Sequence, residues 1–147
     1  MKKFGYITMQ VGIYLILLGG IGDIIYSFSV DTIIPAHLDY LKISSEEAWP
    51  QLRNLDLGFM RGIGGFIIAV GIGALALLHT AVKAGNQLAL AGMVLMITIG
   101  EGNNALQMFL LDSPYYLMPL FYVILFWTGV VLWSAGKEKR LAFNKNQ

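Results

Sequence analysis

The sequence contains no cysteine, and only 13% of its 147 residues are Asp, Glu, Lys or Arg. The absence of cysteine excludes disulfides, thiol nucleophiles, iron–sulfur clusters and zinc sites with cysteine ligands. Ten basic and nine acidic residues give a net charge of +1, so the chain lacks the basic field that nucleic-acid binding needs. Charged residues are also too few to cover the surface of a water-soluble domain of this length.

Hydrophobic residues are abundant instead: they make up 56% of the chain, and its mean hydropathy is +0.65. A helix that crosses a bilayer needs about 20 mostly apolar residues. Four runs of this kind predict an all-α integral membrane protein, a four-helix bundle in one domain over residues 1–147. The predicted helices cover about 4–28, 58–82, 86–111 and 115–136, and an ordered outer loop of about 29–57 joins the first two.

Basic residues indicate the orientation, because Lys and Arg concentrate on the cytoplasmic side of membrane proteins. Most of them fall on one side of the predicted spans: Lys2, Lys3, Lys83, Lys137, Lys139, Arg140 and Lys145. We therefore predict a multi-pass protein of the cell membrane with both termini in the cytoplasm. The first apolar run is longer than a signal peptide requires and has no A-x-A cleavage site, so we expect it to be a retained helix.

The predicted outer loop has enough apolar residues to pack down as a cap over the bundle: Ile33, Ile34, Leu38, Tyr40, Leu41, Ile43 and Trp49. Ser44 and Glu47 have the spacing of a helix capping box. Pro50 offers an alternative helix start, since proline favours the first helical position. Both interpretations stay open from the sequence.

Small residues predict how the helices meet, because close backbone packing drives helix association in lipid. In the first helix, Gly5, Gly12 and Gly19 follow one face that continues to Asp23, so the Asp23 carboxylate should point into the bundle. The second helix has a comparable stripe, which we expect to be a packing seam: Gly58, Gly62, Gly65, Ala69 and Gly73. Such faces also suit association between copies of the chain.

Ionisable residues at membrane depth are functional candidates by default. Counting along the helices places Asp23, Arg61 and Glu101 at one level in the outer part of the bundle. We expect Arg61 to pair with Glu101 or Asp23. One interpretation is a structural ion pair that fixes helix register. The second interpretation is an outward-facing polar pocket under the outer loop, with these candidate ligand contacts: Asp23, His37, Asp56, Arg61, Glu101, Asn104 and Gln107.

No cofactor or metal site is predicted. His37 and Asp39 have only a two-residue spacing, and no H-x-x-H, H-x-x-x-H or H-E-x-x-H motif occurs. The glycine-rich pieces lack the strand before and the G-K-[ST] after that phosphate loops require.

The segment Leu55-Asp56-Leu57-Gly58-Phe59-Met60-Arg61-Gly62-Ile63-Gly64-Gly65, with the following AVGIGALALL, resembles the Arg- and Gly-bearing segment of small DoxX-like membrane proteins. The resemblance covers about a quarter of the chain. It implies a four-helix bundle and supplies no catalytic residues.

Several functions fit these features. The first is binding of a small amphipathic or lipid-like ligand in the polar pocket, whose mix of apolar walls and few polar groups suits such a ligand. The second is an isomerase- or transferase-type enzyme acting on a lipophilic substrate, with Glu101 and Asp23 as acid and base. A structural or assembly subunit is the third, and a proton-coupled carrier is the fourth. The sequence does not decide whether the protein is an enzyme.

Overall fold

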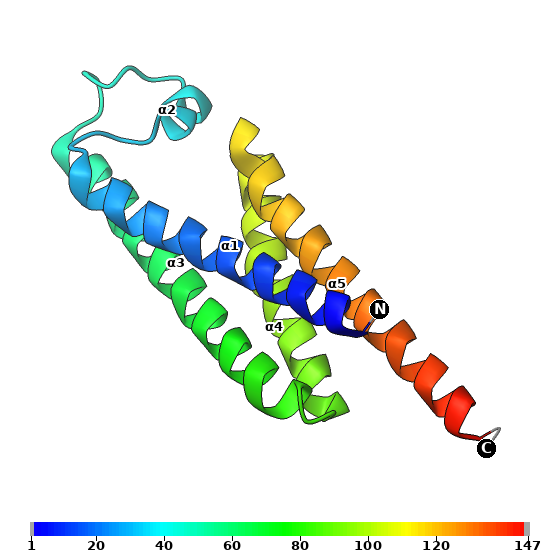
Figure 1. Ribbon diagram of the computed structural model, residues 1–147. Coiled ribbons are helices and arrows are strands. Elements are labelled where there is room, and N and C mark those ends of the chain that lie inside the picture. The colour runs from blue at the N-terminus through cyan, green and yellow to red at the C-terminus, as the bar shows by residue number, and fades with distance from the viewer. Residues whose placement is uncertain (1, 146–147) are drawn as a thin grey trace.

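The computed structural model, which describes the backbone of residues 2–145 and the side chains of residues 2–136, consists of helices joined by short connections (Figure 1). No strand occurs in this part of the chain, so the all-α prediction is confirmed. A π-helical turn, Leu78–Val82, continues the third helix, and a 3-10 turn, Pro114–Tyr116, precedes the fifth. The five α-helices are α1 (Lys2–Ser29), α2 (Pro35–Leu41), α3 (Pro50–Leu77), α4 (Gln87–Leu110) and α5 (Leu117–Lys145).

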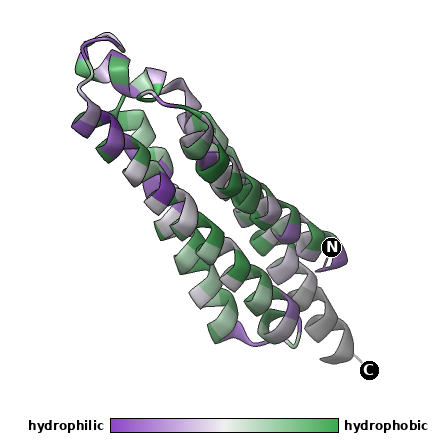
Figure 2. Cartoon of the chain, turned by 90° about the vertical axis from the view of Figure 1, so that its left-hand side faces the viewer, coloured by the Kyte–Doolittle hydropathy of each residue, from purple (hydrophilic) through white to green (hydrophobic). Residues whose placement is uncertain are grey.

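Three helical stretches are long and apolar enough to cross a membrane: Lys2–Ser29, Pro50–Val82 and Pro114–Gly136. Large apolar side chains stand exposed along them, among them Phe4, Leu18, Phe59 and Val131. Figure 2 shows hydrophobic residues along most of the helix shafts and hydrophilic residues mainly at the two ends. An apolar surface of this extent marks a lipid-facing protein. These features suggest a multi-pass membrane protein.

Helix α1 packs most extensively, against α5 on one side and α3 on the other, while α4 contacts both α3 and α5 (Figure 1). The contact of α1 with α5 is a backbone contact that glycine makes possible. A Cβ atom placed on Gly5 would lie 2.4 Å from the Trp133 backbone nitrogen, and one on Gly129 would lie 2.5 Å from that of Met9. The predicted glycine face of α1 is therefore confirmed as a packing face.

Glycine also brings α1 against α3, but at different positions from those predicted. A Cβ atom on Gly20 would lie 2.8 Å from the Gly64 carbonyl oxygen, and one on Gly71 would lie 2.5 Å from the Leu17 side chain. The predicted seam on the second helix is wrong over most of its length: a Cβ atom placed on Gly58, Gly62 or Gly65 would meet nothing within 4 Å. Gly58 and Gly62 instead line an open apolar groove of about 470 Å³ on the outer face of α3.

The physical reason is that two glycine rows lie side by side on α3. The buried row combines glycines with larger apolar side chains, which fill the space between helices: Leu57, Gly64, Ile67, Gly71 and Ala74. The row of glycine and alanine alone has no such side chains to bury, so most of it stays outside, and among its glycines only Gly73 contacts a neighbouring helix, through Met96. Small residues permit close packing, but bulky neighbours decide which face turns inward.

The end of the bundle away from α2 is filled by apolar side chains. Its fully buried members come from all four long helices: Met9, Ile13, Ile16, Ala74, Leu78, Met93, Ile97 and Phe126. Near this end, the Tyr6 hydroxyl and the Nδ1 atom of His79 form a hydrogen bond at 2.6 Å. His79 therefore has a partner on another helix. This core closes the bundle beneath the more polar half.

The loop between α1 and α3 is shorter than predicted. Helix α3 begins at Pro50, with Pro50 in the first turn, rather than at residue 58, and helix α2 occupies part of the loop. The capping-box bonds form as well: the Ser44 amide donates to Glu47 at 2.7 Å, and the Glu47 amide donates to the Ser44 hydroxyl at 3.3 Å. These two hydrogen bonds close a single turn and do not start a long helix, because α3 begins only at Pro50.

The predicted apolar cap forms in part. Ile33 is fully buried, and Ala36 and Ala48 are also buried, whereas Tyr40, Leu41 and Trp49 are exposed. The loop therefore attaches to the bundle through small contacts at the start of α2 and before α3.

Candidate functional site

Helix α1 positions Asp23 where it meets α3. The close approach of Gly20 and Gly64 holds the two helices together one turn before Asp23, and a Cβ atom on Gly64 would lie 3.1 Å from the Asp23 Cβ atom. Asp23 thus begins directly over the α3 backbone, and its side chain is half-buried. The predicted inward direction of Asp23 agrees with this packing.

Helix α4 presents Glu101 on its buried face. The buried positions of α4 recur at spacings of three and four residues: Leu90, Met93, Ile97, Glu101 and Ala105. Glu101 takes a place in this row that an apolar residue would normally occupy, and only 3% of its surface is exposed. Its Oε2 atom is buried and has no hydrogen-bond partner. A buried carboxyl oxygen without a partner is costly and calls for an explanation.

Helix α5 adds Tyr122 to the same place. Its ring lies against Gly19, with Cε2 3.7 Å from a Cβ atom placed there, which is one helical turn from Asp23. Asp23 and Glu101 are near enough for their charges to interact, and the Tyr122 hydroxyl lies near both carboxyl groups. Asn104, one turn after Glu101, brings its amide beside the Glu101 carboxyl group. We call Asp23, Glu101 and Tyr122 the carboxyl cluster.

Arg61 does not join the carboxyl cluster, so its predicted pairing with Glu101 or Asp23 is wrong. Its guanidinium donates to the Ser27 carbonyl oxygen at 2.9 Å and lies over the Phe28 ring, 4.3 Å from the centroid. The Ser27 carbonyl belongs to the last turn of α1, where carbonyls have no partner within the helix. Arg61 therefore caps the end of α1, a role that its position on α3 alone did not indicate.

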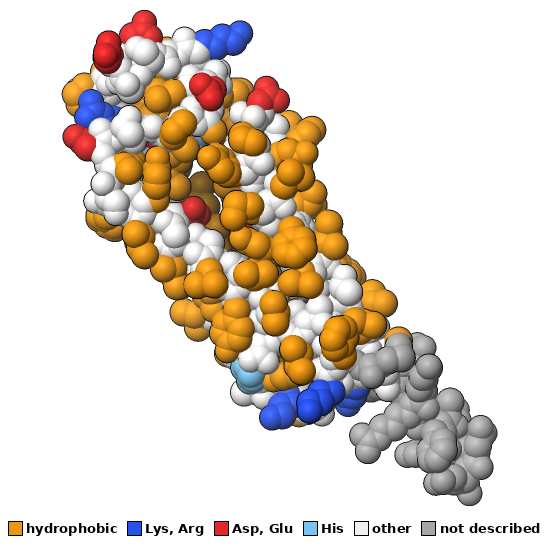
Figure 3. All heavy atoms as spheres, turned by 45° about the horizontal axis from the view of Figure 1, so that its top comes forward, with side chains coloured by type: hydrophobic (Ala, Val, Ile, Leu, Met, Phe, Trp, Pro, Cys, Tyr) orange, Lys and Arg blue, Asp and Glu red, His pale blue; other side chains and the backbone are white. Residues whose placement is uncertain are grey.

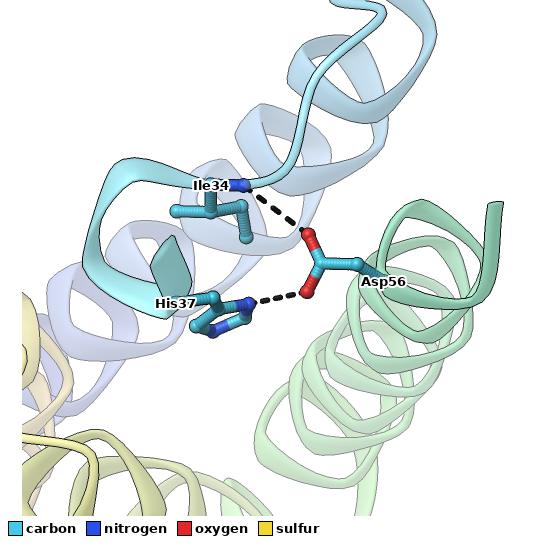
Figure 4. Close-up of polar contacts among 3 residues, drawn as sticks. All are labelled: Ile34, His37 and Asp56. Carbon is cyan, nitrogen blue, oxygen red and sulfur yellow. Dashed lines mark hydrogen bonds and ion pairs between the residues drawn. The ribbon is translucent and has the colours of Figure 1, made fainter. Parts of the chain in front are cut away.

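His37 and Asp56 bind each other rather than the carboxyl cluster (Figure 4). One oxygen of the Asp56 carboxylate accepts a hydrogen bond from the Ile34 amide at 3.2 Å, and the other contacts the His37 ring. Asp56 thus fastens the first turn of α2 to α3. The sequence predicted both residues as pocket candidates, and their mutual contact gives them a definite structural role in the roof of the site.

Gln107 faces away from the cluster. It is exposed and donates to the Asn103 side chain at 3.5 Å along the same helix. Asn104, by contrast, is half-buried and lies on the side of Glu101. The predicted fan of polar residues on α4 therefore divides, with Asn104 at the site and Gln107 outside it.

A hollow opens on the face shown in Figure 3, below the α2 end of the molecule, and an acidic side chain is visible inside it. Hydrophobic side chains surround the opening. The apolar core beneath it, including Ile16, Ile97 and Phe126, is fully buried. The hollow thus combines an acidic side chain with apolar surroundings, the usual make-up of a small-molecule site.

The described residues offer no group of three or more His, Asp or Glu side chains that could hold a metal ion. The only contacts between a basic side chain and a carboxylate among them lie at the α2 end, between His37 and Asp56 and between Arg53 and Asp31. No basic side chain of this part of the chain neutralises the two carboxyl groups of the cluster.

Sequence reasoning missed Tyr122 as a member of the site. The predicted fourth helix contains seven aromatic residues, so Tyr122 did not stand out among them. A useful signal was present: Tyr122 lies one turn before Phe126, which is fully buried, so the two residues share the inner face of α5.

Comparison with known protein families, curated proteins and solved structures finds no match for this chain. The resemblance to DoxX-like proteins therefore stays a prediction. Function has to be inferred from the geometry of the chain itself.

Proposed function

We propose that the chain crosses the cell membrane four times, with both termini in the cytoplasm and α2 outside. Three spans are supported by length and hydropathy. Helix α4 has 24 residues, about 36 Å of helix, which is enough to cross a bilayer core of about 30 Å. Its most buried polar residue, Glu101, faces the bundle rather than the surface.

The distribution of charge supports this orientation. Figure 3 shows Lys and Arg side chains, without Asp or Glu, at the end of this face opposite α2. Lys2, Lys3 and Lys83 belong to that end, and positive charge favours the cytoplasmic side. The side chains of Lys137, Lys139, Arg140 and Lys145 lie outside the described residues.

Single-cysteine labelling tests the four-span topology, because the chain has no cysteine of its own. Ser45→Cys, Ala84→Cys and Tyr115→Cys each place a thiol at an exposed turn position. A membrane-impermeant maleimide added to intact cells should label the first and third but not the second. Equal labelling of Ala84→Cys and Tyr115→Cys would mean that α4 does not cross the membrane.

We propose further that the protein binds a small amphipathic ligand in the hollow beneath α2. The observation that carries this proposal is the buried, unpartnered Oε2 atom of Glu101 beside Asp23. Such a group is unfavourable unless a ligand or a proton satisfies it. The apolar surroundings of the hollow suit the hydrocarbon part of the same molecule.

Native mass spectrometry of the protein extracted with its surrounding lipids tests this binding function. We expect a retained molecule in the wild type that Glu101→Gln and Asp23→Asn lose. Glu46→Gln is the matched control, since it removes an exposed carboxylate from the loop with the same change in net charge. A wild-type spectrum with bulk lipid only, or equal retention in all variants, would contradict the proposal.

A second candidate function is an enzyme that transfers protons on a lipophilic substrate. The observation that favours it is the grouping of two carboxyl groups and a phenol from three helices. Asp23 and Glu101 would act as acid and base, with Tyr122 as a further proton donor. Turnover of an added isoprenoid or sterol that Asp23→Asn abolishes would favour this function over simple binding.

A proton-coupled carrier and an assembly subunit have weaker support. The apolar floor beneath the hollow provides no polar path toward the cytoplasm, which disfavours a carrier. The groove beside Gly58 and Gly62 would suit an assembly subunit, and the subunit count in the same mass spectra measures that role.

A further inference from the structure

The charge of the carboxyl cluster restricts the chemistry of its ligand. Its members are Asp23 from α1, Glu101 from α4 and Tyr122 from α5; the described groups beside them are the Asn104 amide of α4 and the bare backbone of α3 at Gly64. Two of these groups can carry negative charge and the others are neutral. Arg61, the nearest predicted cation, is occupied at the end of α1.

An anionic head group would add negative charge beside two carboxyl groups among apolar side chains, which is strongly unfavourable. A neutral hydroxyl can donate a hydrogen bond but would not balance the charge of either carboxyl group once that group is ionised. A bare metal ion is also a poor fit, because no third His, Asp or Glu ligand joins the pair within the described chain and Ca²⁺ takes six to eight oxygen ligands. An ammonium group supplies both positive charge and hydrogen-bond donors.

We infer that the ligand is a lipophilic amine whose ammonium head binds between Asp23 and Glu101, with its hydrocarbon chain along the apolar wall of the hollow. This inference rests on the binding function proposed above. Asp23 is half-exposed and makes the direct contact, whereas the more deeply buried Glu101 adds negative charge behind it. The Tyr122 ring, one turn from Asp23 along α1, borders the head group.

Three probes with one chain length and different heads test the inference: dodecylamine, dodecanol and dodecanoate. At pH 7 they carry positive, zero and negative charge, since alkyl amines titrate near the pKa of lysine and carboxylic acids near that of glutamate. Binding is titrated with purified protein in a neutral detergent, and the signal of the Asp23→Asn/Glu101→Gln double variant is subtracted. This subtraction removes partitioning of the probe into the micelle.

We expect dodecylamine to bind the wild type at least about tenfold more tightly than dodecanol, the factor expected for a hydrogen bond to a charged group. Asp23→Asn should abolish this preference, and Glu101→Gln should reduce it. Glu46→Gln should leave it unchanged, because that carboxylate is exposed on the loop. Where the double variant fails to fold, protein-free micelles provide the subtraction, and the ranking of head groups on the wild type still decides the question.

The outcomes separate this inference from the function beneath it. Saturable binding of dodecanol or dodecanoate as tight as that of dodecylamine, and lost in the double variant, would overturn the ammonium assignment while the hollow still binds amphiphiles. If no probe binds the wild type more tightly than the double variant, both the inference and the binding function fail.

Two sources could supply the ammonium group: a free amine or the head group of an amino-phospholipid. The titration is therefore repeated in nanodiscs of phosphatidylcholine with and without phosphatidylethanolamine. Weaker dodecylamine binding in the presence of phosphatidylethanolamine identifies the lipid as the source, and unchanged binding identifies a free amine. Both results support an ammonium ligand, whereas absence of saturable binding in both nanodiscs would overturn it.

Discussion

Replacement of Gly129 by alanine should destabilise the bundle, because α1 and α5 touch there through their backbones. The added Cβ atom would lie 2.5 Å from the Met9 nitrogen. Non-bonded heavy atoms prefer about 3.5–4.0 Å, so the helices must separate by roughly 1 Å at this point. Overpacking of this kind costs about 1–3 kcal/mol.

Alanine offsets part of this cost, because it favours the helix over glycine by about 1 kcal/mol. We therefore expect a net loss of up to about 2 kcal/mol for Gly129→Ala, the overpacking cost less the gain in helix propensity. Gly58→Ala is the matched control, since its Cβ atom would meet nothing within 4 Å. The control should be neutral or stabilising by up to about 1 kcal/mol.

Thermal unfolding followed by intrinsic fluorescence measures both variants, and Trp133 lies at the contact with Gly5. Thiol-reactive dyes cannot serve as a readout, because the chain has no cysteine. A further substitution, Gly5→Ala, should add less to Gly129→Ala than it costs alone, since the helices have already separated. A Gly129→Ala protein as stable as Gly58→Ala would refute the backbone contact.

Three further predictions concern the α2 half of the molecule. Arg61→Ala should destabilise the last turn of α1 by about 1–2 kcal/mol, because the charged hydrogen bond to the Ser27 carbonyl is lost. Hydrogen exchange of the α1 amides measures this loss, and the dodecylamine titration should show unchanged binding. Asp56→Asn should speed hydrogen exchange of the α2 amides by about tenfold, because the contact of the Asp56 carboxylate with His37 is lost. Asp39→Asn, on the exposed side of α2, should leave this exchange unchanged, and equal exchange in both variants would contradict the fastening role of Asp56. The hydrogen bond from the Ser44 amide lowers the pKa of the Glu47 carboxyl. The turn therefore has its full stability above the unfolded-state pKa of Glu47 and loses it as pH falls through the lower folded-state pKa. Proton NMR of the Ser44 amide should follow this acid transition in the wild type and show none in Glu47→Gln.

The helices could be predicted from the sequence because hydrophobic runs and their breaks are local signals. The runs located the long helices, and their ends agree within a few residues except at the end of α5, which continues to Lys145, and at the start of α3. There, Pro50 determined the boundary although Asn54 and Asp56 are polar, since the first turns of α3 extend beyond the apolar core. Proline at the first helical position was the correct signal among two alternatives.

The site could be predicted only in part, because it depends on how the helices rotate about their axes. Asp23 was placed by the glycine face that it shares, and Glu101 by its depth in a helix. Arg61 was misplaced, because its long side chain reaches the end of α1 rather than the residues at its own level. The two glycine rows of α3 could not be ranked without knowing which bulky residues would fill the space between helices.

The seating of α1 against α5 has a consequence for biogenesis. Helix α1 is synthesised before α3 and α4, yet its most extensive partner, α5, is synthesised after both. Until α5 is made, the face of α1 around Gly5 and Gly12 lacks its packing partner, and only the neighbouring face can pack against α3. Packing of α1 against α5 therefore follows synthesis of the helices between them, and a ribosome that stalls before residue 117 leaves that glycine face of α1 uncovered.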